Sequence, residues 1–449
     1  MLGPPSVAWP PYVFFREKLS SSRSRSLTHT QREPHMNKYL TSATVALATL
    51  IASPLHAQRA AFDSVYAQVT QQLALKEAEL IALRRDLHQH PELSGAEERT
   101  AGLIAERLQT LGFEVRTGVG GFGVVGILRG AKPGPTIAFR ADMDAARSNA
   151  PDPVEYRSLT PGVRHICGHD VHVTVGLAIA EGLAAVRDEL AGSVMLVFQP
   201  AEENATGALA MLADDVFSFA KPDAIYAVHT APFPVGQLGT KPGGMMAGRD
   251  VVQVTVSGSG DLDGAVDSVR AIINGVTNIS HEEADQSAPD DFVLAQVFPG
   301  RGTGGDHRAV RAQITTANPE VRARAKTTIL DGLENLQLAG VTVEPTYRDR
   351  VMAGVTNDSS LVQRANTSIN SVLGSDAVLP LQRVPPAFSE DFGSFQDEVP
   401  GVMYFLGVSN PTTGTVGMPH SPDYVADDGA ILIGAKAMTA VFLDWLLMP

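Results

Sequence analysis

Cysteine, positive charge and long apolar runs are all scarce in this sequence, and each shortage excludes a class of protein. Cys167 is the only cysteine, which excludes an intramolecular disulfide framework and a zinc finger built from cysteines. Lys and Arg number 35 against 49 Asp and Glu, a formal net charge of −14, so the chain lacks the positive charge that binding to nucleic acid requires. No run after residue 57 reads as long and apolar enough to span a bilayer, so we expect no membrane contact once residues 1–57 are removed.

The rest of the composition is that of a globular protein. The chain has 449 residues, of which 44% are hydrophobic and 19% charged, and this excludes a disordered or collagen-like chain. Its length allows two or three domains, each with its own core.

Residues 36–57 have the features of a secretory signal peptide. Lys38 precedes an apolar run at residues 43–52, and small residues before residue 58 resemble a cleavage site. A buried core helix is the alternative for this run. Residues 1–35 are rich in Ser, Arg and Pro, and we interpret them as a spurious extension in front of the true start at Met36. We therefore expect a periplasmic or secreted protein.

Strand-like apolar runs alternate with helical patterns in two parts of the chain, residues 62–248 and 351–449. The predicted strands are residues 136–140, 193–198, 224–228 and 402–406, and the predicted helices are residues 62–89, 97–110, 169–190 and 205–212. This alternation predicts one α/β domain, in two parts, with helices on both faces of its sheet. Ligands of such sheets bind beyond the carboxyl ends of the strands.

Residues 249–350 have a different pattern, which we interpret as a compact insert. Strands are predicted at residues 250–257, 292–297, 309–315 and 342–346, with helices at residues 263–279 and 321–338. The resulting order, β-α-β-β-α-β, is typical of a ferredoxin-like domain.

The motif His-Ile-Cys-Gly-His-Asp at residues 165–170 indicates metal binding. Cys167 and His169 are two residues apart, so both could ligate one metal ion from a loop that enters a helix. A catalytic pair of Cys167 with His165 or His169, and a merely structural cysteine, are the alternatives.

Further polar residues follow the predicted strands. Glu202 and Glu203 come after the strand at 193–198, where one could ligate a metal ion and the other could reach its water. His229 ends another apolar strand, and His420 lies in a Pro-rich loop. One Cys, one Glu and three His are enough for two metal ions that share a ligand and activate a water molecule. A neighbouring carboxylate could take the proton of that water.

Six motifs occur in order over residues 66–449. They are LRRDLHQHPELS at 83–94, FRADMD at 139–144, HICGHD at 165–170, FQPAEE at 198–203, SEDF at 389–392 and HSP at 420–422. Together they resemble the aminoacylase/carboxypeptidase branch of metallopeptidase family 20, which includes hippurate hydrolases and the plant amidohydrolases of indole-acetyl–amino acid conjugates. The resemblance implies a dinuclear-metal aminopeptidase/carboxypeptidase-like catalytic domain with an inserted ferredoxin-like lid, through which a homodimer can form.

The resemblance also implies roles for individual residues. Glu202 would be the general base and acid, Asp144 would orient a ligand histidine, and Asp142 would lie behind the ligands. The two divalent ions would be zinc or manganese, with cobalt or nickel also compatible. The ligands would be Cys167 as the bridge, His169 and Glu203 at one ion, and His229 and His420 at the other.

Two matching motifs receive no catalytic role. Arg84, Arg85, His88 and His90 lie on the first helix, where we expect packing and surface salt bridges. The SEDF motif, with Glu390 and Asp391, has no assigned role.

The lid departs from the family at three substrate-facing positions. Asp263 stands where the family has a histidine that helps to hold the reacting carbonyl, and Gly302 stands in place of its Asn-x-Ile-Pro motif. Thr315 aligns with a lid arginine that commonly contacts the substrate carboxylate. These changes predict poor turnover of free-acid substrates and better turnover of amides or esters. His307, or less directly His281, could substitute in substrate binding.

The sequence thus predicts an exported metal-dependent amidohydrolase that cleaves N-acyl amino acids, related small amides or short peptides. The alternative is a periplasmic metal- or ligand-binding protein whose turnover is impaired by its altered lid. Glu202 distinguishes them, because a protein that only binds has no need for a carboxylate held beside the metal ligands.

Overall fold

The computed structural model describes residues 41–280, 288–298, 306–383, 386 and 388–448. The chain divides into two units, Met1–Pro54 and Leu55–Pro449. Residues 1–40, which include the predicted extension and the start of the predicted signal peptide, lie outside the described residues. Helix α1 spans Thr41–Gln89, and its predicted apolar positions Leu73, Leu80 and Leu87 are buried in the second unit.

The catalytic domain is built on an eight-stranded sheet in the order β1-β2-β6-β3-β7-β16-β8-β15. Its centre is parallel, because β3 pairs in parallel with β6 and β7, and β7 with β16. The strands are β1 Glu114–Val119, β2 Gly123–Arg129, β3 Lys132–Asp142, β6 Ala191–Gln199, β7 Ala224–Pro234, β8 Leu238–Thr240, β15 Val378–Pro380 and β16 Gly401–Ser409. Two short pairs accompany it, β4 Ala146–Arg147 with β5 Val163–Arg164, and β9 Gly243–Met246 with β14 Val355–Asn357.

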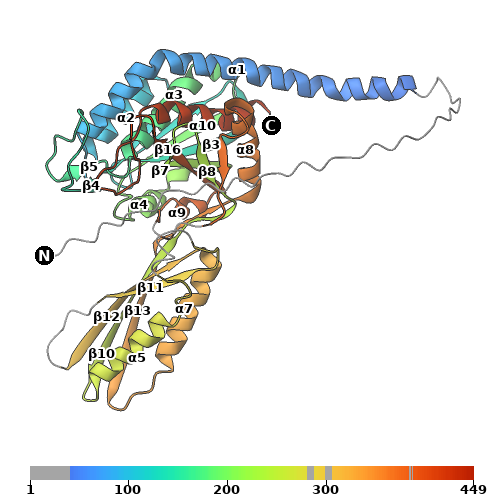
Figure 1. The fold of residues 1–449 in the computed structure, drawn as a ribbon. Helices are drawn as coiled ribbons and strands as arrows, with labels where there is room; N and C mark the ends of the chain where they lie inside the picture. Colours follow the sequence, from blue (N-terminus) through green and yellow to red (C-terminus); the bar gives the residue numbers. More distant parts are fainter. Residues whose placement is uncertain (1–40, 281–287, 299–305, 384–385, 387, 449) are drawn as a thin grey trace, which may run out of the picture. The chain divides into compact units, whose positions relative to one another are not determined.

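Helices cover both faces of this sheet, as the alternating sequence pattern predicts (Figure 1). On one face α1 packs into a common core with four other helices, α2 Glu98–Thr110, α3 His169–Ala184, α8 Ser359–Leu373 and α10 Gly429–Leu447. On the other face α4 Gly207–Ala213 and α9 Gly393–Gln396 contribute to a second core. The predicted α/β class is confirmed. Because both faces are covered, β6 and β16 are almost continuously apolar and buried.

Helix α10 corrects one expectation from the sequence. An 18-residue window of this 19-residue helix has a mean hydropathy of 1.7, so length and composition alone would allow it to cross a membrane. Within the structure, however, 72% of that window is buried, and the helix packs against α3 and α8. Its apolar character is therefore explained by its place in the core.

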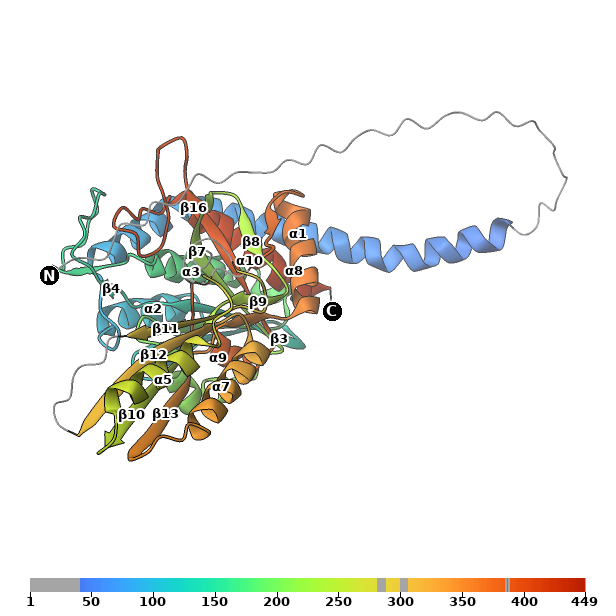
Figure 2. The ribbon, with the colours of Figure 1, turned by 60° about the horizontal axis from the view of Figure 1, so that its bottom comes forward.

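The lid contains the predicted β-α-β-β-α-β order, which confirms a ferredoxin-like insert. Its elements are β10 Gly248–Gly258, α5 Leu262–Asn274, β11 Val293–Phe298, β12 His307–Thr316, α7 Pro319–Glu334 and β13 Val341–Met352. The strands form an antiparallel sheet in the order β11-β12-β10-β13. Both helices lie on one face of it (Figure 2). Asp261 and Asn318 cap them by accepting bonds from backbone N–H groups.

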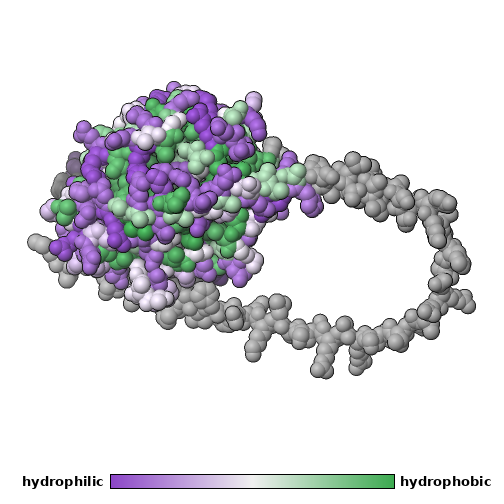
Figure 3. Space-filling view, turned by 90° about the horizontal axis from the view of Figure 1, so that it is seen from above, coloured by the Kyte–Doolittle hydropathy of each residue, from purple (hydrophilic) through white to green (hydrophobic). Residues whose placement is uncertain are grey.

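The described surface mixes polar and apolar residues, as Figure 3 shows for one face. Exposed large apolar side chains among the described residues are Leu75, Leu159, Leu209 and Val416. They are far apart in the sequence and come from different segments. Isolated apolar residues of this kind are normal on protein surfaces and do not indicate a binding site.

Candidate metal centre and active site

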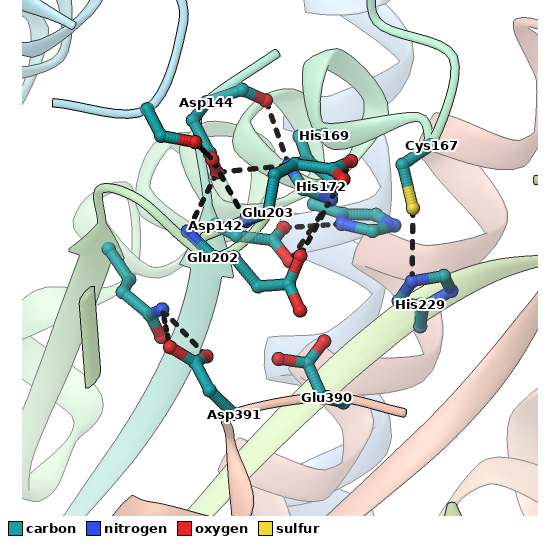
Figure 4. A network of polar contacts seen from close by, with 12 residues as sticks. Asp142, Asp144, Cys167, His169, His172, Glu202, Glu203, His229, Glu390 and Asp391 are labelled. Atoms are coloured by element: carbon teal, nitrogen blue, oxygen red, sulfur yellow. Dashed lines mark hydrogen bonds and ion pairs between the residues drawn. The ribbon is translucent and has the colours of Figure 1, made fainter. Parts of the chain in front are cut away.

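The predicted site residues meet at the carboxyl ends of the central parallel strands, as expected for an open α/β sheet (Figure 4). Asp142 is the last residue of β3, and Glu202 and Glu203 follow β6. His229 lies within β7, beside β16. The site is therefore positioned by the most deeply buried strands of the molecule.

Cys167 and His169 enter this site from the turn before α3. Gly168 between them has φ 91°, in the left-handed region that favours glycine. A Cβ at this position would lie 2.1 Å from the Tyr424 hydroxyl and 2.7 Å from the Thr230 hydroxyl. Only glycine fits there, which explains why the cysteine and the histidine are separated by Gly.

The structure brings all five predicted ligands together. Cys167, His169 and His229 form one group, and Cys167, Glu203 and His420 form another, with donor atoms within 4.8 Å of one another in each group. Cys167 belongs to both groups, as a shared ligand would. Glu203 lies near both His420 and His169, since His169, Glu202 and Glu203 form a further group of this kind. Which of the remaining four ligands share an ion therefore stays a prediction.

Hydrogen bonds fix which nitrogen of two histidines faces the centre. His169 Nδ1 lies 2.8 Å from the backbone carbonyl of Asp144, and His229 Nδ1 lies 2.8 Å from that of Thr230. A carbonyl only accepts, so both Nδ1 atoms must carry the hydrogen. In the neutral ring, each Nε2 then presents its lone pair. His229 Nε2 lies 3.4 Å from the Cys167 sulfur.

The residues present fit a divalent metal ion. His169 Nε2 and Glu203 Oε1 are buried and have no hydrogen-bond partner among the described residues, and buried polar atoms without a partner are uncommon unless an ion or water satisfies them. Burial lowers the pKa of His229 to about 3, which favours the neutral ring that binds metals. Thiolate, imidazole and carboxylate together are a ligand set of zinc and related ions.

Asp144 connects the two halves of the site. Its carboxylate accepts hydrogen bonds from the backbone N–H groups of Glu202 and Glu203, at 3.1 and 3.0 Å, and from the Ser94 hydroxyl at 2.7 Å. Its backbone carbonyl holds His169. Asp144 therefore fixes the turn that carries both glutamates and the orientation of one histidine.

Glu202 is buried but stands apart from both groups that contain Cys167. Its carboxylate lies 3.8 Å from His169 Nε2, and it groups with His169 and Glu203 on one side and with Glu390 and Asp391 on the other. Burial first, and then the neighbouring Glu390 and Asp391 carboxylates, raise the pKa of Glu202. This placement suits a group that exchanges a proton.

The SEDF motif, for which no role was predicted, lies beneath the site. Arg140 binds Glu390 at 2.7 Å, Asp391 at 3.1 Å and Asp142 at 2.9 Å. Gln199 donates to both oxygens of Asp391. A single buried guanidinium thus holds together the end of β3 and the SEDF loop.

Asp142 supports the histidines from behind. Its carboxylate lies 2.6 Å from His172 Nδ1, and the backbone N–H of Thr230 donates to His172 Nε2. His172 was missed by sequence reasoning, although it lies three residues after His169 and hence one helical turn further along α3.

Of the four residues of α1 for which packing and surface salt bridges were expected, Arg84 and His88 are buried. Arg84 forms ion pairs with Asp170 at 2.8 Å and Asp428 at 3.0 Å. His88 contacts Asp170 at 2.9 Å. These bonds fasten α1 to the residue after His169. Arg85 and His90, whose side chains are 47% and 41% exposed, are on the surface as expected.

Burial of the thiol argues against the cysteine-nucleophile alternative. Burial raises the pKa of Cys167 more than the neighbouring His169 lowers it, whereas a nucleophilic cysteine needs a lowered pKa. His165 is buried, and its ring nitrogens have no hydrogen-bond partner among the described residues.

The structure does not bring the lid histidine to the site. His307 pairs with Ser257 at the end of β10 opposite to Gly248, where β10 begins, and its side chain is 47% exposed. Asp263 is 83% exposed and pairs with Arg308. His281 and Gly302 lie outside the described residues.

Comparisons with known proteins agree with this architecture. A sequence model described as peptidase family M20/M25/M40 matches residues 138–444. Thermostable carboxypeptidase 2 of Saccharolobus solfataricus is 33% identical over 377 residues, covering 80% of this chain and 93% of that protein. IAA-amino acid hydrolase ILR1-like 4 of Arabidopsis thaliana is 29% identical over 386 residues, covering 82% of this chain and 86% of that protein.

Comparison with solved structures indicates the same family. The Bacillus subtilis YXEP protein, described as a dinuclear metal binding peptidase from the M20 family, has a TM-score of 0.69 and 26% identity to this chain. The match covers 83% of this chain and 99% of that one. The likeness therefore includes the lid as well as the catalytic domain.

Proposed function

The chain belongs to peptidase family M20/M25/M40 and is a metal-dependent hydrolase of amide or peptide bonds, and we propose that its substrates are N-acyl amino acids, related small amides or short peptides. The names of the relatives support this range, since one is a carboxypeptidase and another an IAA-amino acid hydrolase. The observation that carries the proposal is the position of Glu202, buried beside the predicted metal ligands yet outside both groups formed around Cys167.

In this proposal Cys167, His169, His229, Glu203 and His420 hold two divalent ions, zinc or manganese in the first place. Such ions, when bound, polarise a carbonyl and lower the pKa of water. The remaining chemistry falls to side chains of the protein. Asp144 keeps the Glu202–Glu203 turn and His169 in place through the hydrogen bonds described above.

Glu202 is the proposed general base and then the general acid. Its carboxylate takes a proton as water attacks the amide carbonyl carbon, and it delivers that proton to the nitrogen as the C–N bond breaks. A raised pKa favours the second half of this cycle, because a protonated carboxyl must be available to the leaving nitrogen. A protein that only binds a ligand would not need this group, so Glu202 favours the hydrolase over the binding-protein alternative, which rests on the altered lid.

We also propose that the protein is exported and acts in the periplasm or outside the cell. The support is the charged flank and apolar run of residues 36–57.

The distinct roles of the paired glutamates give the test. Glu202→Gln should keep its metal but lose roughly two to four orders of magnitude in kcat, the usual range for general acid–base catalysis. Glu203→Gln, the matched control with the same change one residue away, should instead lower metal affinity because a ligand is removed. The measurement is kcat on N-acyl amino acids together with metal titration of both variants. Equal behaviour of the two variants in the titration would contradict the assigned roles.

A further inference from the structure

Arg249 lies at the base of the lid, directly across from the position where the family's lid arginine is missing. Strand β10 pairs with β12 in an unbroken register, in which Arg249 is opposite Thr315. Directly opposite residues of an antiparallel pair point to the same face, with Cβ atoms about 4.5–5.5 Å apart. The positive charge absent at residue 315 is therefore present on the neighbouring strand.

The strand alternation places Arg249 on the helix-free face of the lid sheet. Val252, Val254 and Val256 of β10 point into the lid core beneath α5 and α7. Side chains alternate along a strand, and the even-numbered residues of β10 from 248 to 256 are buried whereas Arg249 is only partly buried, so Arg249 points to the opposite face, away from both helices. His307 pairs with Ser257, eight residues further along β10, roughly 27 Å away at the usual rise of a strand.

The chain just before Arg249 is anchored in the catalytic domain. Met245 and Met246 are buried in the core beneath the catalytic sheet, and the Ala247 N–H donates to the Phe388 carbonyl at 3.1 Å. Arg249 is thus held at the junction of the two domains.

The electrostatics agree that Arg249 faces the site. Burial lowers the pKa of Arg249, and the nearby Glu202 carboxylate opposes that effect. Arg249 therefore lies within electrostatic range of the proposed general base, in agreement with its position at the junction of the two domains.

We propose that Arg249 binds the free carboxylate of the substrate and makes the enzyme prefer N-acyl amino acids over the corresponding amides. The inference rests on the proposed function and reverses the preference expected from the lid alignment. A guanidinium can bind a carboxylate through two parallel, charge-assisted hydrogen bonds. An uncharged amide at the same place offers no such pairing, so Arg249 would discriminate between the two classes.

Matched substrate pairs test this proposal. N-acetylglycine and N-benzoylglycine are compared with their glycinamide counterparts, using wild-type enzyme, Arg249→Gln and Arg311→Gln. Arg311 is a matched control, because it is an exposed arginine on the same strand and face as Thr315, four residues further from the site. In Arg249→Gln we expect the acid-to-amide ratio of kcat/KM to fall about 10- to 100-fold, mainly through KM for the acids. Arg311→Gln should leave the ratio unchanged.

Moving the positive charge from β10 to the opposite position on β12 tests the proposal independently. The double variant Arg249→Gln/Thr315→Arg should recover much of the acid preference, and Arg249→Lys should retain part of it. An unchanged ratio in Arg249→Gln, or equal losses on acids and amides, would overturn the role of Arg249. Wild-type enzyme that prefers the amides would overturn it without any variant. Failure to hydrolyse acids and amides alike would instead overturn the proposed function, and the inference with it.

Discussion

Arg140 is fully buried and faces three carboxylates, from Asp142, Glu390 and Asp391. Removing one partner of a buried ion network leaves charges that water cannot reach. Arg140→Met should therefore lower the free energy of unfolding by about 3–5 kcal/mol, measured by chemical denaturation of the metal-free protein.

Arg129→Met is the matched control for this prediction. Arg129 pairs with Glu114 on the surface at 2.7 Å, with both side chains about half exposed. An exposed pair contributes about 0–1 kcal/mol, so this variant should unfold almost like the wild type. Equal losses of unfolding free energy in the two variants would show that the buried network around Arg140 stabilises the fold no more than the exposed Arg129–Glu114 pair does.

The sequence predicted which residues meet at the site, because the spacing of Cys167 and His169 and the strand-end positions of the glutamates are local features. The approach of His420 to Glu203 depends on where a distant loop folds, which no local pattern records. Arg249 was missed because the alignment directs attention to residue 315, whereas the strand register points to its neighbour.

The burial of two charged or polar residues of α1 was also not predictable from the sequence. Packing or surface salt bridges were both expected for Arg84 and His88, and the partners that bury them, Asp170 and Asp428, come from distant segments. Only the tertiary structure brings these charges together, and it connects the first helix to the loop of the predicted metal ligands.

At the scale of elements, strands were predictable because buried parallel strands are continuously apolar. The ends of the helices were harder to predict than the strands. The helix expected to run through Leu190 ends at Ala184, and a short 3-10 turn at Arg187–Glu189 follows before β6. The helix expected to reach Ile279 ends at Asn274, before Gly275, a residue with low helix propensity.

The first helix carries a prediction about processing. The charged flank and apolar run before residue 58 should direct export and be removed near Ala57. N-terminal sequencing of protein recovered from the periplasm or medium measures this directly. A mature N-terminus before Met36 would contradict the interpretation of the first residues.

At the scale of the whole molecule, the catalytic domain and the lid have separate cores, and the proposed substrate site lies where they join. The catalytic sheet supplies the predicted metal ligands and Glu202, while the base of the lid supplies Arg249. Catalysis and substrate choice are thus assigned to different domains. The predicted ligand set is complete, whereas the lid departs from the family pattern at Asp263 and Thr315.

The central claim is that amide hydrolysis by this protein depends on metal held around Cys167. The most direct measurement is hydrolysis of N-acyl amino acids by purified protein before chelation, after chelation to demonstrated absence of metal, and after a divalent ion is returned. The account predicts loss of activity on removal and recovery on return, because the attacking water needs the ions for its activation. Full activity in metal-free protein would contradict it.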